Sequence, residues 1–257
     1  MKKQSPKSGK SIAWAIAFLA LLATIIIASF FWKLVLFLEK SSFDGSHQFI
    51  LAKEGEKNEL ISFNPDQQSV EIVDYSAKLG VPPGQRFALP LDGTIHENGQ
   101  GLRDMLFGAL FHHNGTVSPV DIVKLLWFSA TLPKNGVSTE TLPVDDQQAA
   151  LRIPRLFQDK SLYAEGKSIT IVNATDVSGL GTRLAKLLTD IGANVIMVST
   201  ADSPASHSSI TYNGDSSYSL SRLQKILHIT PKQVPSVSAI SDITITIGND
   251  MAQTAIF

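Results

Sequence analysis

A glycine-containing turn is the clearest candidate for chemistry in the sequence. Residues 178–182 read Ser-Gly-Leu-Gly-Thr and stand between an apolar strand pattern and an amphipathic helix pattern. Backbone N–H groups at the start of a helix can hold an anion such as phosphate, and Arg183 could reinforce such a site. A dinucleotide-binding loop would need a third glycine where Leu184 stands. We therefore favour a tight turn that needs the conformational freedom of Gly179 and Gly181, and keep anion binding as the alternative.

Other residue types that often do chemistry lack a supporting pattern. The chain has no cysteine, which excludes disulfides, a thiolate nucleophile and a cysteine zinc site. His112 and His113 are adjacent, so they cannot share a helix face as zinc ligands four residues apart do, and they suit a helix end. Asp145 and Asp146 lie in a polar stretch and are expected to be solvated. We predict no metal, no cofactor and no catalytic residue.

The charge balance argues against a nucleic-acid partner. Lys and Arg number 22 and Asp and Glu number 23, for a net charge of −1. The first forty residues hold six lysines and one glutamate, so the rest of the chain is acidic. An acidic body is repelled by the phosphates of DNA and RNA.

An uncharged apolar run over residues 12–32 predicts a transmembrane helix. At about 1.5 Å per residue it would cross the hydrocarbon core of roughly 30 Å. Four lysines precede the run, which predicts a cytoplasmic basic tail over residues 1–11 and an extracytoplasmic body. A cleaved signal peptide is the alternative, but residues 28–30 (Ala-Ser-Phe) are a poor cleavage site. We favour a single-pass anchor in the cytoplasmic membrane, from Ile12 to Trp32.

The first part of the body shows strand patterns followed by helix patterns. Three runs suggest an antiparallel meander: residues 47–54, 59–63 and 69–75. The prolines within residues 80–84 should end this pairing. Two helices are expected over residues 101–112 and 119–131, the second with Ser118 as its N-cap and Pro119 at its first position. A last extended element is expected within residues 137–144, and a domain linker over residues 145–165.

The last part of the chain is more regular. Its pattern is strand, helix, strand, strand, helix, strand, over residues 168–173, 178–191, 194–199, 208–213, 216–227 and 242–248. Two helices against one mixed sheet form a two-layer sandwich of ordinary domain size. The expected fold class of the chain is therefore α/β (α+β).

Residues 166–257 resemble the LytR_C-type domain of LytR-CpsA-Psr family proteins. The resemblance lies in "ITIVNATDVSGLGTRLAKLLTDIGANVIMVS" and in the closing strand "DITITIGND". Residues 43–144 resemble, through "ELISFNPDQQSVEIVD", a reduced form of the LytR-CpsA-Psr domain. The resemblance implies a membrane-anchored protein with its domains outside the cell. Full enzymes of the family move glycopolymers from a polyprenyl-pyrophosphate carrier to peptidoglycan, with Mg²⁺, acidic ligands and arginines around the pyrophosphate.

This sequence departs from the family where those charges belong. A charged turn over residues 54–59 replaces the Ser-Asp segment that supplies metal ligands, and residues 74–78 lack the Arg-Asp pair. Arg86, or Arg103 with Asp104, could be remnants of a pyrophosphate site, although a surface role is favoured for each. The region is therefore interpreted as a degenerate relative without transferase activity.

Three hypotheses about function remain. The preferred one is a non-catalytic binding or scaffolding module linked to cell-wall glycopolymer attachment, with glycopolymer or an envelope protein as its partner. The first alternative is a divergent Mg²⁺-dependent phosphotransferase that acts on polyprenyl-pyrophosphate-linked glycan. The second is a membrane-tethered regulator, which the acidic outward body argues against as a direct DNA binder.

Overall fold

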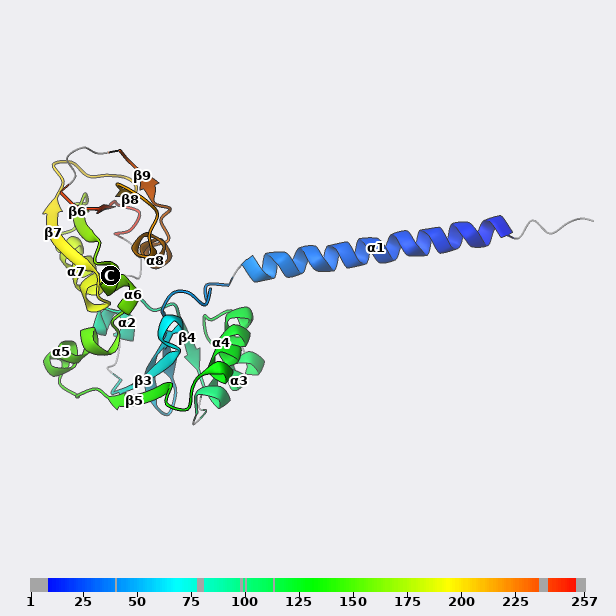
Figure 1. Cartoon of the computed structure of the whole chain (residues 1–257), viewed down its shortest axis with the longest axis horizontal. Helices are drawn as coiled ribbons and strands as arrows, with labels where there is room; N and C mark the ends of the chain where they lie inside the picture. Colours follow the sequence, from blue (N-terminus) through cyan, green and yellow to red (C-terminus); the bar gives the residue numbers. More distant parts are fainter. Residues whose placement is uncertain are drawn as a thin grey trace, which may run out of the picture. The chain divides into compact units, whose positions relative to one another are not determined.

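The chain is described here from a computed structural model that covers residues 9–39, 41–77, 81–97, 99, 101–112, 114–235 and 240–252 (Figure 1). It divides into two compact units, Met1–Ser41 and Ser42–Phe257. The first eight residues of the predicted basic tail and His113 lie outside the described residues.

Helix α1 (Gly9–Glu39) is the regular element of the first unit. Its sequence is dominated by alanine, leucine, isoleucine and phenylalanine, and no proline interrupts it, so nothing breaks the backbone hydrogen bonds. Among the residues that the structure describes, no helix is long and apolar enough to cross a membrane. The transmembrane helix over residues 12–32 therefore stays a prediction.

The first sheet of the body has the strand order β4-β1-β2-β3-β5. Strands β1 (Phe49–Glu54), β2 (Asn58–Asn64) and β3 (Ser69–Tyr75) form the expected antiparallel meander, with Ala52 opposite Leu60 and Leu60 opposite Val73. The short 3-10 helix η1 (Pro65–Gln67) makes the turn between β2 and β3. The meander prediction is confirmed.

The expectation that strand pairing ends at residues 80–84 is wrong. Pro83 instead occupies the first turn of helix α2 (Pro83–Phe87), where its missing N–H costs nothing. The chain then returns as β4 (Gly93–His96), which pairs in parallel with β1. At the other edge β5 (Val137–Thr141) pairs in parallel with β3, within the range predicted to be extended. The prolines therefore separate β3 from β4 along the sequence, but β4 still belongs to the same sheet.

Both faces of this sheet are covered because apolar side chains alternate on both sides of its strands. Phe49 and Leu51 of β1 face helices α3 (Leu102–His112) and α4 (Pro119–Thr131), whereas Ile50 and Ala52 join a second core on the other face. The predicted cap of α4 is confirmed, since the Ser118 hydroxyl accepts from the Asp121 N–H. The sheet is thus an inner layer of the body.

The stretch predicted as a linker, residues 145–165, forms two helices. Asp145 caps α5 (Asp146–Leu156) and Asp159 caps α6 (Lys160–Glu165), each accepting from a backbone N–H. Ala149 and Ile153, four residues apart, are buried on one face of α5, and Phe157 and Leu162 are also buried. This segment therefore contributes to a core shared with both halves of the body.

The second sheet has the strand order β7-β6-β10-β8-β9 and contains the predicted pattern of elements. Its elements are β6 (Ser168–Asn173), α7 (Leu180–Asp190), β7 (Asn194–Thr200), β8 (Ser209–Tyr212), α8 (Tyr218–Leu227), β9 (Lys232–Gln233) and β10 (Ile243–Ile247). Strand β6 is parallel to β7 and β10, and β8 is antiparallel to β10. The mixed α/β class is confirmed, and the two-residue β9 is an addition.

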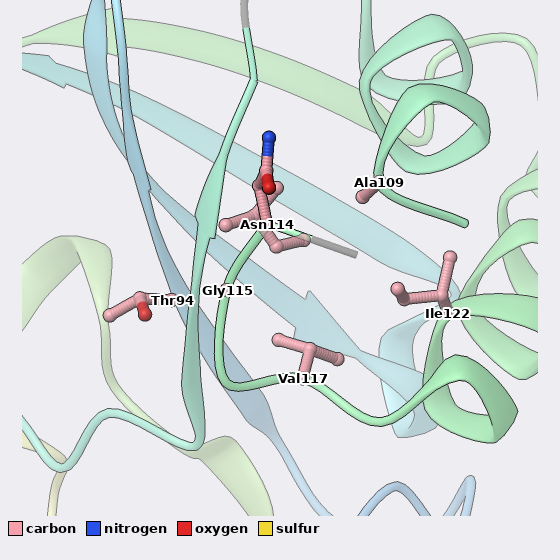
Figure 2. Close-up of a pocket in the computed structure, with 7 residues that line it drawn as sticks. Thr94, Ala109, Asn114, Gly115, Val117 and Ile122 are labelled. Carbon is pink, nitrogen blue, oxygen red and sulfur yellow. The ribbon is translucent and has the colours of Figure 1, made fainter. Parts of the chain in front are cut away.

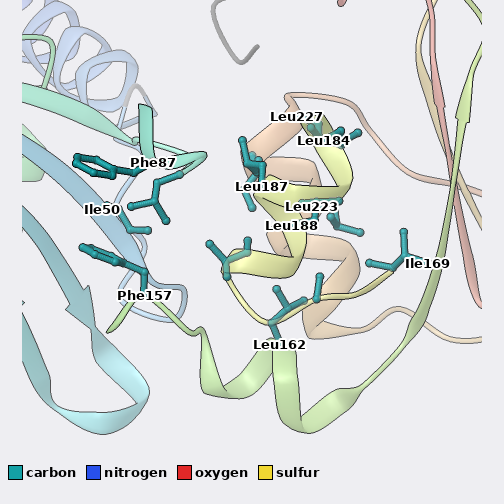
Figure 3. Packing of buried hydrophobic residues seen from close by; sticks show 14 of the residues in the cluster. Ile50, Phe87, Phe157, Leu162, Ile169, Leu184, Leu187, Leu188, Leu223 and Leu227 are labelled. Atoms are coloured by element: carbon teal, nitrogen blue, oxygen red, sulfur yellow. The ribbon is translucent and has the colours of Figure 1, made fainter. Parts of the chain in front are cut away.

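One continuous core joins the two sheets (Figure 3). It includes Ile50 from the first sheet, Phe157 after α5, Leu188 from α7, Leu223 from α8 and Ile169 from the second sheet. In Figure 3, Phe157 lies beside Ile50 and Phe87, and Leu162 lies under the helices that carry the leucines. Because this core is continuous, residues 42–257 pack as one compact unit.

We expect Phe157→Ala to lower the free energy of unfolding by about 3–5 kcal/mol, because it opens a cavity in the shared core. Chemical denaturation of the full chain measures this change. Leu151→Ala in α5 is the matched control, since Leu151 is 81% exposed and should change stability by no more than about 0.5 kcal/mol. Equal effects of the two substitutions would contradict the shared core.

Candidate functional site

The segment that follows α1, Ser42–Gln48, is fixed at its beginning to helix α4. The backbone N–H groups of Ser42 and Phe43 donate to the two carboxylate oxygens of Asp121, at 3.2 and 2.8 Å. Asp121 is buried in the first turn of α4, where the helix dipole favours a carboxylate. Lys124 donates to the Phe43 carbonyl, and the Phe43 ring meets Phe128 edge-on.

The same segment is fixed at its end to helix α8. His47 Nδ1 lies 2.7 Å from Asp44 Oδ2, and His47 Nε2 lies 2.7 Å from the Ser221 hydroxyl. The imidazole stacks on the Tyr218 ring with centroids 4.7 Å apart. Lys225 forms an ion pair with Asp44 at 2.7 Å. These five residues, called the α8 junction below, tie the segment after α1 to the C-terminal part of the body.

Hydrogen bonds in the α8 junction link Ser221, His47 and Asp44 in the order of a Ser–His–Asp catalytic triad, but their geometry suits a structural connection. The Ser221 hydroxyl donates to the Tyr218 carbonyl one helical turn earlier, so its proton already has an acceptor. His47 is only 9% exposed and is covered by the Tyr218 ring. A nucleophile must instead be open to its substrate and aimed at it. We therefore interpret the junction as a connection and assign it no catalysis.

A buried charge cluster lies beneath the junction. Arg222 of α8 is fully buried, with Nε 3.4 Å from Asp159 Oδ2 and Nη1 4.0 Å from Asp92 Oδ1. Asp92 also accepts from the Ile50 N–H of β1 at 2.8 Å, and Asp159 accepts from the Tyr218 hydroxyl at 2.8 Å. Among the described residues the guanidinium has ion-pair partners but no aligned hydrogen bond. Charge balance is therefore the main force that holds it.

The surroundings shift the pKa values of Asp92 and Asp44 in opposite directions. Burial raises the pKa of Asp92, although Arg222 and the Ile50 N–H partly offset this. Partial burial also raises the pKa of Asp44, but hydrogen bonds from His47, Lys225 and two backbone N–H groups outweigh it. The pKa of Asp44 therefore lies well below its ordinary value. Burial and the neighbouring Asp159 carboxylate raise the pKa of Tyr218, so its hydroxyl stays protonated and can donate.

The predicted site residue Arg86 serves local structure. It lies on α2 with its side chain 8% exposed, and its Nη2 is 2.6 Å from a carboxylate oxygen of Asp146. The guanidinium also donates to the Ser76 carbonyl and lies over the Phe87 ring. The expectation that Asp146 is merely solvated is therefore wrong, because Asp146 pairs with Arg86 and so links α5 to α2.

The structure does not bring Arg103 to Arg86. Arg103 lies on α3, and its Nη2 donates to the Ser129 carbonyl of α4 at 2.9 Å. Helix α3 covers one face of the first sheet, whereas Phe87 of α2 belongs to the core on the other face. The two arginines therefore cannot hold one pyrophosphate together. Asp104 is exposed in the first turn of α3.

The glycine turn before α7 has a steric role. Gly179 is the N-cap of α7 with φ +83°, a left-handed conformation that glycine adopts readily. A Cβ on Gly181 would lie 2.9 Å from a methyl group of Val198, so the helix could not approach β7 as closely. Arg183 is exposed on α7. These contacts support the tight turn, and anion binding by Gly179, Gly181 and Arg183 stays a prediction.

The remaining polar candidates show no metal centre. Within the part of the chain that the structure describes, no group of three or more histidine, aspartate or glutamate side chains could hold a metal ion. His112 lies in the last turn of α3, as expected, and its Nδ1 is 2.8 Å from a Glu97 carboxylate oxygen.

A shallow hollow lies between β4, the loop over residues 114–117 and helices α3 and α4 (Figure 2). Ala109 and Ile122 line one side and Thr94 the other. Its empty volume of about 160 Å³, open mouth included, is below the roughly 300–1,000 Å³ of ligand pockets.

The α8 junction and the charge cluster were not predicted from the sequence. Their residues are spread between Asp44 and Lys225, and no short motif contains them. One signal was present in α8, where Arg222 lies among Leu220, Leu223 and Ile226 on the apolar face of the helix. A charged residue in that position indicates a buried partner of opposite sign.

The fold and these contacts define an α/β protein whose C-terminal sandwich is tied to the segment after α1. Residues 167–250 match the family model LytR_C, described as LytR cell envelope-related transcriptional attenuator. This match covers about a third of the chain and identifies its C-terminal part as a LytR_C domain. Searches of curated proteins and of solved structures returned no match.

We expect Arg222→Met to lower the free energy of unfolding by about 3–5 kcal/mol, because it leaves two buried carboxylates without their cation. The native pKa of Asp92 would rise further above its unfolded value. Above the native pKa of Asp92 in the wild-type chain, the variant would still hold a proton that the wild type has released, so the deficit relative to wild type should grow as pH rises through that raised value. Gln224→Met, at an exposed position of α8, is the matched control in denaturation series at several pH values.

Asp44→Asn tests the α8 junction through pH. The depressed pKa of Asp44 contributes stability that is present above the unfolded value of about 3.9 and is lost as pH falls toward the native pKa. The wild-type chain should therefore lose its advantage over Asp44→Asn as pH falls below about 4. Asp176→Asn, at an exposed position, serves as control. A difference that does not change with pH would contradict the ion-paired Asp44.

Proposed function

We propose that the protein is a single-pass envelope protein, anchored through residues 12–32, whose extracytoplasmic body is a non-catalytic module for cell-wall glycopolymer or an envelope protein. The LytR_C match supports the link to the cell envelope. The uncharged run and the lysines before it support the anchor and its orientation. The body would then present its LytR_C domain to the wall.

The α8 junction is the observation that carries the scaffolding role. The segment directly after α1 is bonded at one end to α4 and at the other to α8 of the LytR_C domain. A free linker would let the domain turn independently of its anchor, whereas these bonds fix it to the start of the body. A scaffold needs such a fixed connection, because a load or a bound partner must be held in a defined place.

The contacts that Arg86 and Arg103 make also support a role without catalysis. A transferase that acts on a pyrophosphate needs cations that converge on it and stay available to it. Arg86 is committed to Asp146 and Ser76, and Arg103 is on the opposite side of the first sheet. Mg²⁺-dependent transfer therefore remains the alternative without a specific observation in its favour.

Purified full chain in detergent tests this proposal with two assays. We expect it to co-sediment with wall sacculi that carry glycopolymer, and to release no phosphate from a polyprenyl-pyrophosphate-linked glycan with Mg²⁺. Sacculi stripped of glycopolymer, and detergent extracts of envelope proteins, identify which partner is held. Mg²⁺-dependent release that Arg103→Ala abolishes, in a sample that thermal unfolding shows to be folded, would establish the transferase instead.

A further inference from the structure

The outer face of the α3–α4 layer is apolar and exposed. Met105 and Leu106 of α3 and Ile122 and Leu125 of α4 point to the first sheet. The opposite side of the two helices carries four large side chains, 52–74% exposed: Phe107, Phe111, Val123 and Trp127. Each helix contributes a pair four residues apart, which places the pair on one stripe. These four residues are called the aromatic face.

The composition of this face departs from that of an ordinary solvated helix. The outer side of a surface helix normally carries charged and polar residues, yet here Phe107 and Phe111 contact each other with centroids 4.9 Å apart. Arg103 and Asp104, exposed at the start of α3, have opposite signs and give no net field. Removal of these apolar side chains from water would therefore be the main contribution to the free energy of binding at this face, and charge attraction would contribute little. Tryptophan in particular favours the boundary between lipid and water.

The start of α4 is hydrogen-bonded to a residue that follows α1 closely in the sequence. Helix α1 ends at Glu39, and three residues later Ser42 is hydrogen-bonded to Asp121 of α4. Three residues span at most about 10 Å of extended chain. If residues 12–32 are the anchor, the seven further helical residues to Glu39 add about 10 Å. Covalent connection alone then holds the start of α4 within about 20 Å of the membrane surface.

We propose that the aromatic face docks on the lipid bilayer that α1 crosses, with Trp127 and Phe107 among the headgroups. This inference rests on the proposed membrane anchor. A second copy of the chain would suit the face less well, because specific interfaces bury about 800 Å² on each partner over about 20–30 residues. Four side chains are enough for shallow insertion beside an anchor that already supplies the attachment. The docked face would orient the LytR_C domain relative to the membrane.

The chain has three tryptophans, which allows a direct test. Trp14→Phe with Trp32→Phe leaves Trp127 as the sole tryptophan in the full chain. This variant is reconstituted in phosphatidylethanolamine–phosphatidylglycerol bilayers whose acyl chains carry bromine close to the headgroup or near the bilayer centre. We expect a blue shift of Trp127 emission and quenching by the shallow bromine but not by the deep one. Unquenched emission at the wavelength of a water-exposed tryptophan would overturn the docking.

Two further variants separate the docking from the anchor and from other occupants. The variant Trp14→Phe with Trp127→Phe has Trp32 as its sole tryptophan and reports on the anchor. If bromine quenches Trp32 in this variant but does not quench Trp127 in the first one, the anchor is retained and the docking is rejected. Trp32 and Trp127 both unquenched would reject the anchor and the docking together. A control variant carries Tyr163→Trp in a chain whose three native tryptophans are replaced by phenylalanine. Tyr163 lies on α6 and is 64% exposed, and the tryptophan at this position should stay unquenched. A blue shift of Trp127 in detergent that grows with protein concentration would assign the face to a second copy and overturn the proposal.

Discussion

The burial of Arg222 between Asp92 and Asp159 is the constraint on which the arrangement of the body depends. A guanidinium removed from water is strongly unfavourable unless carboxylates come with it. Here one carboxylate precedes β4, the other caps α6, and the cation belongs to α8. Each carboxylate also accepts a hydrogen bond, Asp92 from a backbone N–H of β1 and Asp159 from the Tyr218 hydroxyl. The charges are balanced only when the first sheet, α6 and the LytR_C domain meet.

This constraint explains why the LytR_C domain is not joined to the body by a simple tether. Helices α5 and α6 fill the space between the two sheets and place Phe157 and Leu162 in the core that both share. The α8 junction adds bonds from the segment after α1 to the same helix that carries Arg222. A partner bound to the LytR_C domain would therefore be held in a fixed relation to the start of the body, as a scaffold requires.

The parts of the fold that depend on local pattern were predictable. The two helices and four main strands of the LytR_C domain follow from periodicity, and the start of α4 follows from Ser118 and Pro119. Local pattern failed where distant residues decide the outcome. The strand β4 pairs with β1 although the prolines within residues 80–84 lie between them in the sequence. The polar residues at the start of α5 suggested a linker, and only the packed core shows which side of this helix is buried. The α8 junction joins Asp44 to Lys225, and no spacing rule connects residues so far apart.

Native-state hydrogen exchange on the full chain, at increasing denaturant below the unfolding transition, tests most directly whether residues 42–257 form one cooperative unit. The informative amides are those of Leu60 and Ile61 in β2 of the first sheet and of Ile245 in β10 of the second, all fully or almost fully buried. We expect these amides to converge on one free energy of opening with one dependence on denaturant. Protection of β10 that persists after β2 has exchanged would show two independently unfolding domains, and would contradict the central role of the shared core and its buried charges.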